Sequence, residues 1–175
     1  MSYQIDLTNL LKEQYKLDKT IQDNHHVTYK ETKQKRLVAL LVELGEFANT
    51  TRCFKFWSNK GMDSKERILD EAADCLHFYL SLWICETYSE CVLISNYNNK
   101  IEMFAHSEDF VADNDQITDY FLRAYKDAVN HNRSIMHSLK WFLEIINCLG
   151  FTWSDLEKAY YKKLGVNYDR QNNNY

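Results

Sequence analysis

The chain contains no proline and only four glycines in 175 residues. These two residue types most often interrupt regular elements and form the tight turns of β-sheet proteins. Their scarcity therefore favours long helices over a fold made of short strands. With 45% hydrophobic and 14% aromatic residues, a chain of this length can bury one substantial core. We predict a single all-α domain, a helical bundle spanning residues 1–175.

Apolar residues at helical spacing divide the chain into long segments. The predicted helices span about Asp6–Gln22, Tyr29–Arg52, Asp63–Glu90 and Gln116–Cys148, the last with a candidate break at Asn130–Arg133. A final helix follows, with Ser154 and Glu157 at the spacing of a capping box, as Asp63 and Glu66 are at the third helix. Both pairs predict where a helix begins.

Two polar stretches fall outside this pattern. Residues 95–100 and 105–115 bracket one short predicted helix, and we expect a peripheral insertion at about 95–115. The asparagine-rich end, Gly165–Tyr175, is too polar to be predicted as ordered from its composition.

Charge and cysteine usage limit the partners of the chain. A net charge of −4 offers no basic face for a nucleic-acid duplex or an anionic membrane. The five cysteines are odd in number and lack C-x-x-C spacing, which is typical of a reducing compartment. The most apolar segment, Cys75–Ile94, is interrupted by His77, Glu86 and Glu90, so it predicts a buried helix rather than a membrane span. We expect a cytoplasmic protein that binds neither a duplex nor a membrane.

Four acidic residues form two pairs with helical spacing. Glu43 and Glu46 are three residues apart in the second helix, as are Glu71 and Asp74 in the third, so each pair projects from one helical face. Two such faces opposed would gather four carboxylates, and like charges brought together favour a bound cation. Magnesium or manganese prefers such oxygen ligands.

The alternative is that the four acids are solvated stripes on amphipathic helices. Such stripes usually mix acids with lysine or arginine. Around Glu71 and Asp74 only Arg67 could pair, and the neighbours of Glu43 and Glu46 one turn away are Ala39, Phe47, Val42 and Thr50. The residues alone leave both interpretations open.

His77 extends the stripe of Glu71 and Asp74 by one turn. A di-iron bundle of the ferritin type would require an E-x-x-H pair from each of two helices, and the chain has no E-x-x-H. Magnesium is therefore the better prediction. His77 is expected to orient a ligand or to be a satisfied core histidine, rather than to bind the metal itself.

The order of motifs resembles the dimeric, all-helical dUTP diphosphatases, which belong to the wider MazG-like group of helical NTP pyrophosphohydrolases. The resemblance covers most of the chain. It rests on L-x-x-Q-x-x-L-D at Leu11–Asp18, E-x-x-E at Glu43–Glu46, the aromatic-lysine segment Phe54–Trp57, E-x-x-D within Asp70–Leu82, and the final segment YYKKLGVNYDRQNNNY.

The resemblance implies Mg²⁺-dependent hydrolysis of dUTP, and of dUDP, to dUMP, with pyrophosphate released from dUTP. It also implies that Glu43, Glu46, Glu71 and Asp74 bind two or three Mg²⁺ ions, for which Mn²⁺ could substitute, and that Glu46 is the base that activates water. The family further implies a homodimer. For the interface we considered the apolar stretches Leu76–Ile94 and Trp141–Ile146, which could equally serve the monomer core.

The same resemblance suggests residues that contact the substrate. Gln14 and Asp18 are expected at the base, although related sequences often have asparagine at the position of Asp18, and an ionised carboxylate cannot donate a hydrogen bond. Phe54 or Trp57 is expected to stack on the base or sugar. Phosphate contacts are expected from Lys55, Lys163 and Arg170, and Asn167 and Tyr175 belong to the same final motif as Lys163 and Arg170. Residues 165–175 could form a C-terminal lid that closes over the phosphates.

Two alternatives remain at this stage. The same fold could hydrolyse another nucleoside triphosphate, such as dCTP. Some proteins of this family are encoded by phages and bind repressor proteins of mobile genetic islands, so the main role could instead be binding such a repressor in the bacterial host cytoplasm.

Overall fold

The computed structural model describes residues 2–87, 98–104 and 112–173. Its described helices are α1 (Thr8–His25), α2 (Tyr29–Thr51), α3 (Lys65–Thr87), α4 (Asn114–Ala128), α5 (Ile135–Cys148) and α6 (Trp153–Asn172). Two strands, β1 (Ser2–Asp6) and β2 (Lys100–Phe104), form an antiparallel pair. The predicted all-α class is confirmed, with this small sheet added at one end.

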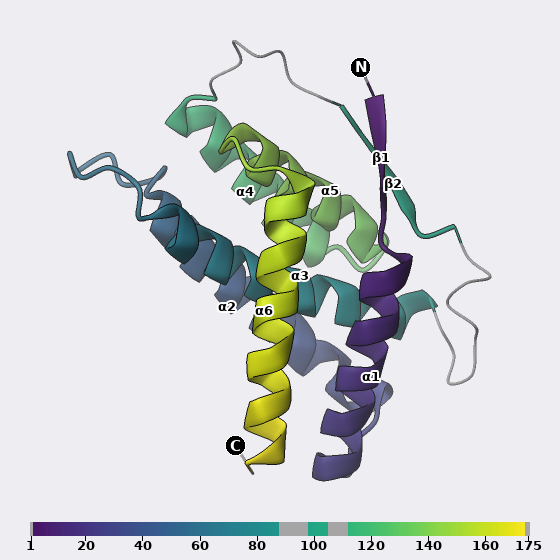
Figure 1. Ribbon diagram of the computed structural model, residues 1–175. Helices are drawn as coiled ribbons and strands as arrows, with labels where there is room; N and C mark the ends of the chain where they lie inside the picture. Colours follow the sequence, from purple (N-terminus) through teal and green to yellow (C-terminus); the bar gives the residue numbers. More distant parts are fainter. Residues whose placement is uncertain (1, 88–97, 105–111, 174–175) are drawn as a thin grey trace.

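Helix α3 is the centre of the bundle and packs against α1, α2, α5 and α6. Figure 1 shows α6 crossing α3 and lying beside α1, while α4 and α5 form a packed pair on the other side. Residues from both ends of the chain therefore meet at one face of α3. The predicted break at Asn130–Arg133 is confirmed, since it separates α4 from α5.

The core surrounds α3 and includes residues from the other helices and both strands. The ring of Phe47 makes edge contacts with Phe121 and Phe142, with ring centroids 5.2 and 5.7 Å apart. Both apolar stretches considered for a dimer interface contribute to this monomer core over their described residues, which include the fully buried Leu76 and Phe142. These described residues therefore serve the monomer core.

The helices begin at capping hydrogen bonds, only some of which were predicted from the sequence. At α2, the hydroxyl of Thr28 accepts from the Glu31 N–H while the Glu31 carboxylate accepts from the Thr28 N–H. The predicted box at Ser154 and Glu157 is wrong, because Thr152 and Asp155 form it two residues earlier. At α3, the Ser64 hydroxyl accepts from the Arg67 N–H. Ser64, rather than the predicted Asp63, therefore accepts from the first turn of this helix.

The short helix predicted around residues 101–104 is wrong, because these residues form β2. Lys100–Phe104 alternates exposed and buried side chains, which is the period of a strand. Ile101 pairs with Ile5 across the sheet, and both side chains are buried. Of the predicted insertion at 95–115, residues 95–97 and 105–111 lie outside the described residues, and residues 114–115 begin α4.

The polar end of the chain is helical rather than irregular. Helix α6 continues to Asn172, an order that the composition of Gly165–Tyr175 did not predict. Contacts with α1 and α3 explain the difference, since tertiary packing stabilises helices whose own sequence is weakly helical. Asn167 and Arg170 therefore project from a regular helix.

Gly45 lies between the two glutamates of α2 and lets α4 approach closely. A Cβ atom added at Gly45 would lie 3.3 Å from the hydroxyl oxygen of Tyr125. That hydroxyl donates to the backbone oxygen of Leu41, at 3.2 Å. The absence of a side chain at position 45 thus permits a direct contact between α4 and the α2 backbone.

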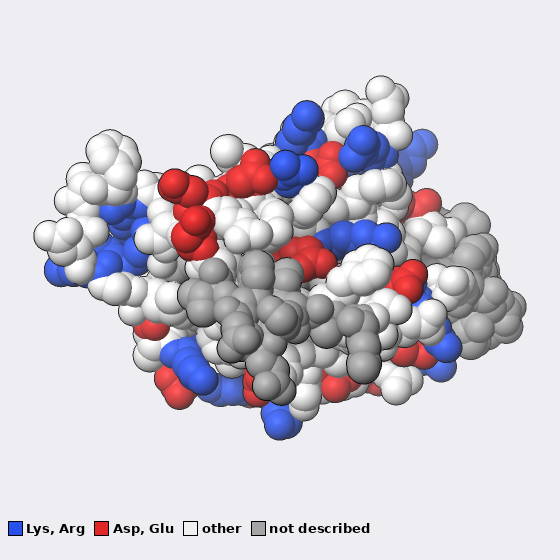
Figure 2. All heavy atoms as spheres, turned by 90° about the horizontal axis from the view of Figure 1, so that it is seen from above, with Lys and Arg blue, Asp and Glu red and all other residues white. Residues whose placement is uncertain are grey.

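Within the described chain, no helix is both long and apolar enough to cross a membrane. On the described part of the face in Figure 2, Lys and Arg side chains are interspersed with Asp and Glu. This face lacks the continuous positive surface that a nucleic-acid duplex would require.

Candidate active site

A cleft of about 720 Å³ opens between α1, α2, α3 and α6. It brings together most of the residues predicted for the site, although they are spread over more than 150 positions of sequence. The predicted residues that line it are Gln14, Asp18, Glu43, Glu46, Glu71, Asp74, His77, Lys163, Asn167 and Arg170.

Three of the four predicted metal ligands meet at one end of the cleft. Carboxylate oxygens of Glu43, Glu46 and Glu71 all lie within 4.8 Å of one another. The first two project from α2, one turn apart, and face the third across the contact between α2 and α3. The two acidic faces therefore meet as one cluster, in which Glu46 is still exposed to solvent.

Burial and mutual repulsion make this cluster electrostatically unfavourable when it is fully ionised. Burial, followed by the charges of Asp74, Glu46 and Glu71, raises the pKa of Glu43 to about 7. Burial also raises the pKa of Glu71 and of Asp74. A bound cation would remove this cost, whereas a proton removes it only in part.

Two basic residues partly neutralise the cluster. Arg67 pairs with Glu71 one turn along α3, as its spacing predicted. From α6, the ammonium of Lys163 lies 2.8 Å from a carboxylate oxygen of Asp74 and 2.9 Å from one of Asp70. Burial disfavours the charge on Lys163, but these contacts outweigh it and raise its pKa. Asp74 thus lies beside the cluster and is already paired with the ammonium group of Lys163.

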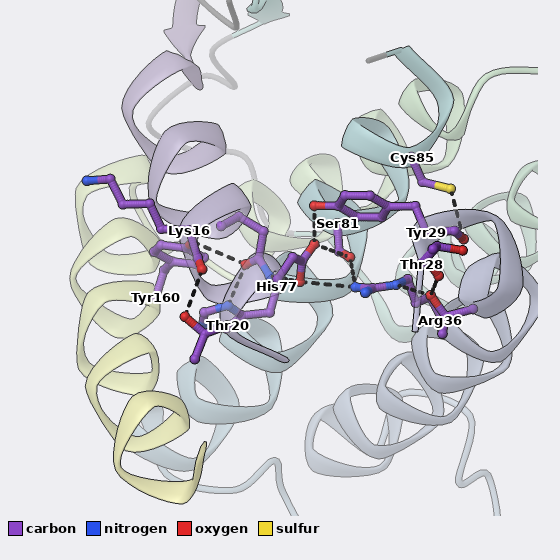
Figure 3. Close-up of polar contacts among 12 residues, drawn as sticks. Lys16, Thr20, Thr28, Tyr29, Arg36, His77, Ser81, Cys85 and Tyr160 are labelled. Atoms are coloured by element: carbon purple, nitrogen blue, oxygen red, sulfur yellow. Dashed lines mark hydrogen bonds and ion pairs between the residues drawn. The ribbon is translucent and has the colours of Figure 1, made fainter. Parts of the chain in front are cut away.

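The other end of the cleft contains a second buried carboxylate, that of Asp18. One of its oxygens accepts from the Gln14 amide and pairs with Arg36, both at 3.0 Å. The other accepts from the hydroxyls of Ser81, at 2.6 Å, and Tyr29, at 3.0 Å. Figure 3 shows the guanidinium of Arg36 and the ring of Tyr29 pointing from α2 toward Ser81 on α3.

His77 contacts this second end rather than the carboxylate cluster. Its Nδ1 lies 2.7 Å from the amide oxygen of Gln14, and its ring stacks on Tyr160 with centroids 4.2 Å apart. Burial lowers the pKa of His77 to about 3, so the ring is neutral. Its Nε2 is buried and has no hydrogen-bond partner among the described residues.

Three predicted substrate residues do not reach the cleft of this chain. Phe54, Lys55 and Trp57 lie in the connection between α2 and α3, which projects away from the bundle in Figure 1. The side chain of Trp57 is 65% exposed and contacts Phe54 and Phe56. None of the three lines the cleft. Tyr175 lies outside the described residues.

Several residues of the cleft were not singled out from the sequence. Arg36 and Asp70 are the most important, because one pairs with Asp18 and the other holds Lys163. Arg36 directly precedes the apolar half of α2, but its burial is apparent only in the structure. Asp70 lies one turn before Asp74, so its position on the same face was also readable.

These observations define the class of protein as an all-α hydrolase with a carboxylate centre. A cluster of acidic side chains and nearby cations in one cleft is suited to binding phosphates through divalent metals. The comparison with protein families gives the particular family: the model described as dUTPase matches residues 6–175. The chain belongs to this dUTPase family and is a dUTP diphosphatase. No curated protein matches the chain significantly.

Proposed function

We propose that the cleft hydrolyses dUTP, and dUDP, to dUMP with Mg²⁺ held by Glu43, Glu46, Glu71 and Asp74. The observation that carries this proposal is the meeting of three glutamate carboxylates within 4.8 Å inside a cleft that also contains basic side chains. Membership of the dUTPase family supports the nucleotide.

The residues present fit a divalent metal. All the proposed ligands are carboxylates, which Mg²⁺ and Mn²⁺ prefer over nitrogen or sulfur ligands. Burial and the neighbouring acids raise the pKa of Glu43, and such an environment favours a bound cation. When bound, two or three Mg²⁺ ions would neutralise phosphate charge and lower the pKa of a bound water.

Glu46 is the proposed general base. It is exposed, whereas Glu71 is buried and Glu43 is half-buried. Solvent can therefore reach the Glu46 carboxylate, which is the requirement for accepting a proton from an attacking water. Glu43 and Glu71 would instead fix the geometry of the centre.

Basic side chains near the cluster are suited to the phosphates. Lys163 and Arg170 project from α6 into the cleft, and Lys35 and Arg67 line it from α2 and α3. Arginine can bind two phosphate oxygens at once. Lys163 already contacts Asp70 and Asp74, so it is positioned beside the proposed metal centre.

The C-terminal part of α6 is the proposed lid. Residues 165–172 are helical, and Asn167, Arg170 and Gln171 line the cleft. Closure over the substrate would therefore move or extend a helix end rather than order a loose tail. Deletion of residues 165–175 should sharply lower turnover and leave most of the circular dichroism signal; unchanged turnover would contradict the lid.

We also propose that the protein forms a homodimer, as its family resemblance implies. The exposed apolar side chains include Val38 and Val42 on α2, which are 60% and 52% exposed and one turn apart. A stable interface would bury such residues. Light scattering during gel filtration should give twice the mass of the chain, and Val42→Glu should weaken the dimer if α2 participates.

The decisive experiment is a pyrophosphate-release assay over the common deoxynucleoside triphosphates, with Mg²⁺ and with a chelator. A preference for dUTP that disappears with the chelator would support the proposal. A preference for dCTP would show that dUTP is not the preferred substrate. Hydrolysis that persists in chelator would contradict the proposed dependence on Mg²⁺.

A further inference from the structure

Lys163 is a largely buried cation that two neighbouring carboxylates of α3 share. Its ammonium lies 2.8 Å from an oxygen of Asp74 and 2.9 Å from an oxygen of Asp70. The lysine comes from α6, and its side chain is only 10% exposed. The two acids are one turn apart on α3, so one ammonium can bridge them. Lys163 is therefore the counterion that the protein itself provides for both acids.

The two carboxylates differ in what else lies near them. Asp74 is a proposed metal ligand, and among the neighbouring acids its charge contributes most to the raised pKa of Glu43. Asp70 is more exposed, at 40% of its side chain against 22% for Asp74. Among the described residues, Asp70 is not one of the clustered acids that could share a metal ion. A metal at the cluster would therefore compete with Lys163 for Asp74 and leave Asp70 to the lysine.

Electrostatics decides the direction of this competition. A divalent ion and an ammonium on the same carboxylate repel each other, so a metal at Asp74 weakens the contact of that carboxylate with Lys163. The contact with Asp70 remains and keeps the ammonium in the cleft. An ammonium has three N–H donors, and Asp70 occupies one of them. The other two are then available to phosphate oxygens.

The position of Lys163 on α6 suits this change of partner. Lys163, Asn167 and Arg170 are spaced four and three residues apart, so they share one face of the helix. All three line the cleft. The flexible four-carbon stem of a lysine allows its ammonium to change partners without a movement of the helix. Asp70 is the fixed contact about which this change can occur.

We propose that Asp70 is a positioning residue, which retains Lys163 while its ammonium changes partner from Asp74 to a phosphate of the nucleotide. In the free protein Lys163 is then the counterion that Mg²⁺ displaces from Asp74, and in the complex it binds the nucleotide. The inference rests on the proposed Mg²⁺-dependent hydrolysis and adds a carboxylate outside the proposed metal ligands. It requires Lys163 to oppose metal binding and to support nucleotide binding.

The first measurement is metal affinity in the absence of nucleotide. Mn²⁺ is titrated into the full chain, and the free ion is followed by electron paramagnetic resonance. Lys163→Met should bind Mn²⁺ about tenfold more tightly than the wild type, because no ammonium competes for Asp74. Equal or weaker binding in Lys163→Met would overturn the inference and leave the metal centre intact. A wild-type protein that binds no Mn²⁺ would overturn the proposed metal centre and the inference together.

The matched control is Arg170→Met, which removes another cation of α6. The charge of Arg170 also acts on Asp74, but less strongly than that of Lys163. Loss of this charge should tighten Mn²⁺ binding by less than about threefold, since solvent and salt screen it. Equal tightening in the two variants would reduce the effect of Lys163 to that of any nearby positive charge, and would overturn the displacement.

A double-mutant cycle tests the role of Asp70. Asp70→Asn should weaken binding of the α,β-imido analogue of dUTP about fivefold at saturating Mg²⁺, measured by calorimetry, because Lys163 loses the contact that retains it. In the Lys163→Met background, the same substitution should change the affinity by less than about twofold, since Asp70 acts through Lys163. Equal losses in both backgrounds would overturn the positioning role of Asp70.

Discussion

Asp18 and Glu43 are carboxylates in the same cleft with opposite environments. Asp18 is almost fully buried and receives two partners on each oxygen, including Arg36. Glu43 is only half-buried, yet burial and three neighbouring acids raise its pKa to about 7. Burial alone therefore does not decide whether a carboxylate is compensated by the protein, because compensation depends on the charges and hydrogen-bond donors around it.

The difference teaches what each end of the cleft is built for. A carboxylate whose partners all come from the protein is already satisfied and holds its neighbours in place. A carboxylate whose neighbours are also acids is stable only with a ligand that the protein does not supply. The Asp18 end is thus preorganised, and we propose that a metal completes the Glu43 end.

The largest effect is expected from Glu46→Gln. Removal of the proposed base should lower kcat by about a thousandfold, with little change in the free energy of unfolding because Glu46 is exposed. Steady-state pyrophosphate release gives the rate. Glu102→Gln, at an exposed position of β2, is the matched control and should retain normal turnover. Normal turnover in Glu46→Gln would mean that another group takes the proton.

The next effect concerns stability at the Asp18 end. Arg36→Met leaves a buried carboxylate without its cation and should lower the free energy of unfolding by about 3 kcal/mol, measured by urea denaturation. Arg123→Met breaks an exposed ion pair with Asp119 and should cost less than about 1 kcal/mol. Equal losses in the free energy of unfolding would show that the buried pair stabilises the fold no more than the exposed pair does.

A smaller effect is expected where the two ends of the chain meet. Lys163→Met removes the cation that contacts Asp70 and Asp74, and should weaken nucleotide binding by about tenfold. Calorimetry with a nonhydrolysable analogue measures the affinity. Lys162→Met changes the neighbouring exposed lysine and should bind normally. An unchanged affinity in Lys163→Met would limit Lys163 to a structural role.

The smallest effect is the pH dependence at the Glu43 end. The folded-state pKa of Glu43 is raised above its ordinary value of 4.5, so the metal-free protein loses stability as pH rises from about 4.5 to about 7. Relative to Glu43→Gln, the loss should be about 1 kcal/mol, allowing for solvent screening of a half-exposed group. Urea denaturation in chelator measures it. Parallel pH profiles for the two proteins would show that the protein already compensates this charge.

Much of the fold was readable from the sequence because helical periodicity extends over long segments. The spacing that predicted a helix over Tyr29–Arg52 matches α2 within one residue. The strand β2 was missed because its partner β1 lies almost a hundred residues away, so its stability depends on a nonlocal pairing. The order of α6 was missed for the same reason, since contacts with α1 and α3 stabilise it.

For the candidate site, the sequence predicted which kinds of residue are present better than it predicted which residues contact one another. Helical spacing and the family resemblance predicted Glu43, Glu46 and Glu71, which the structure brings together. No local pattern could pair Arg36 with Asp18, because the partners lie on different helices. The aromatic-lysine segment at Phe54–Trp57 matched a family motif, but a motif does not show where a projecting connection lies.

The missing side chain at Gly45 links the two sides of α2. Tyr125 occupies the space beside this glycine and holds the backbone of the turn before Glu43 and Glu46. A single added methyl group would lie 3.3 Å from the Tyr125 hydroxyl oxygen, so this side chain would have to shift by a few tenths of an ångström against the turn that carries both glutamates. Metal affinity could therefore be tuned from the α4 side of this helix, without changing any ligand, and screens for altered metal dependence should include position 45.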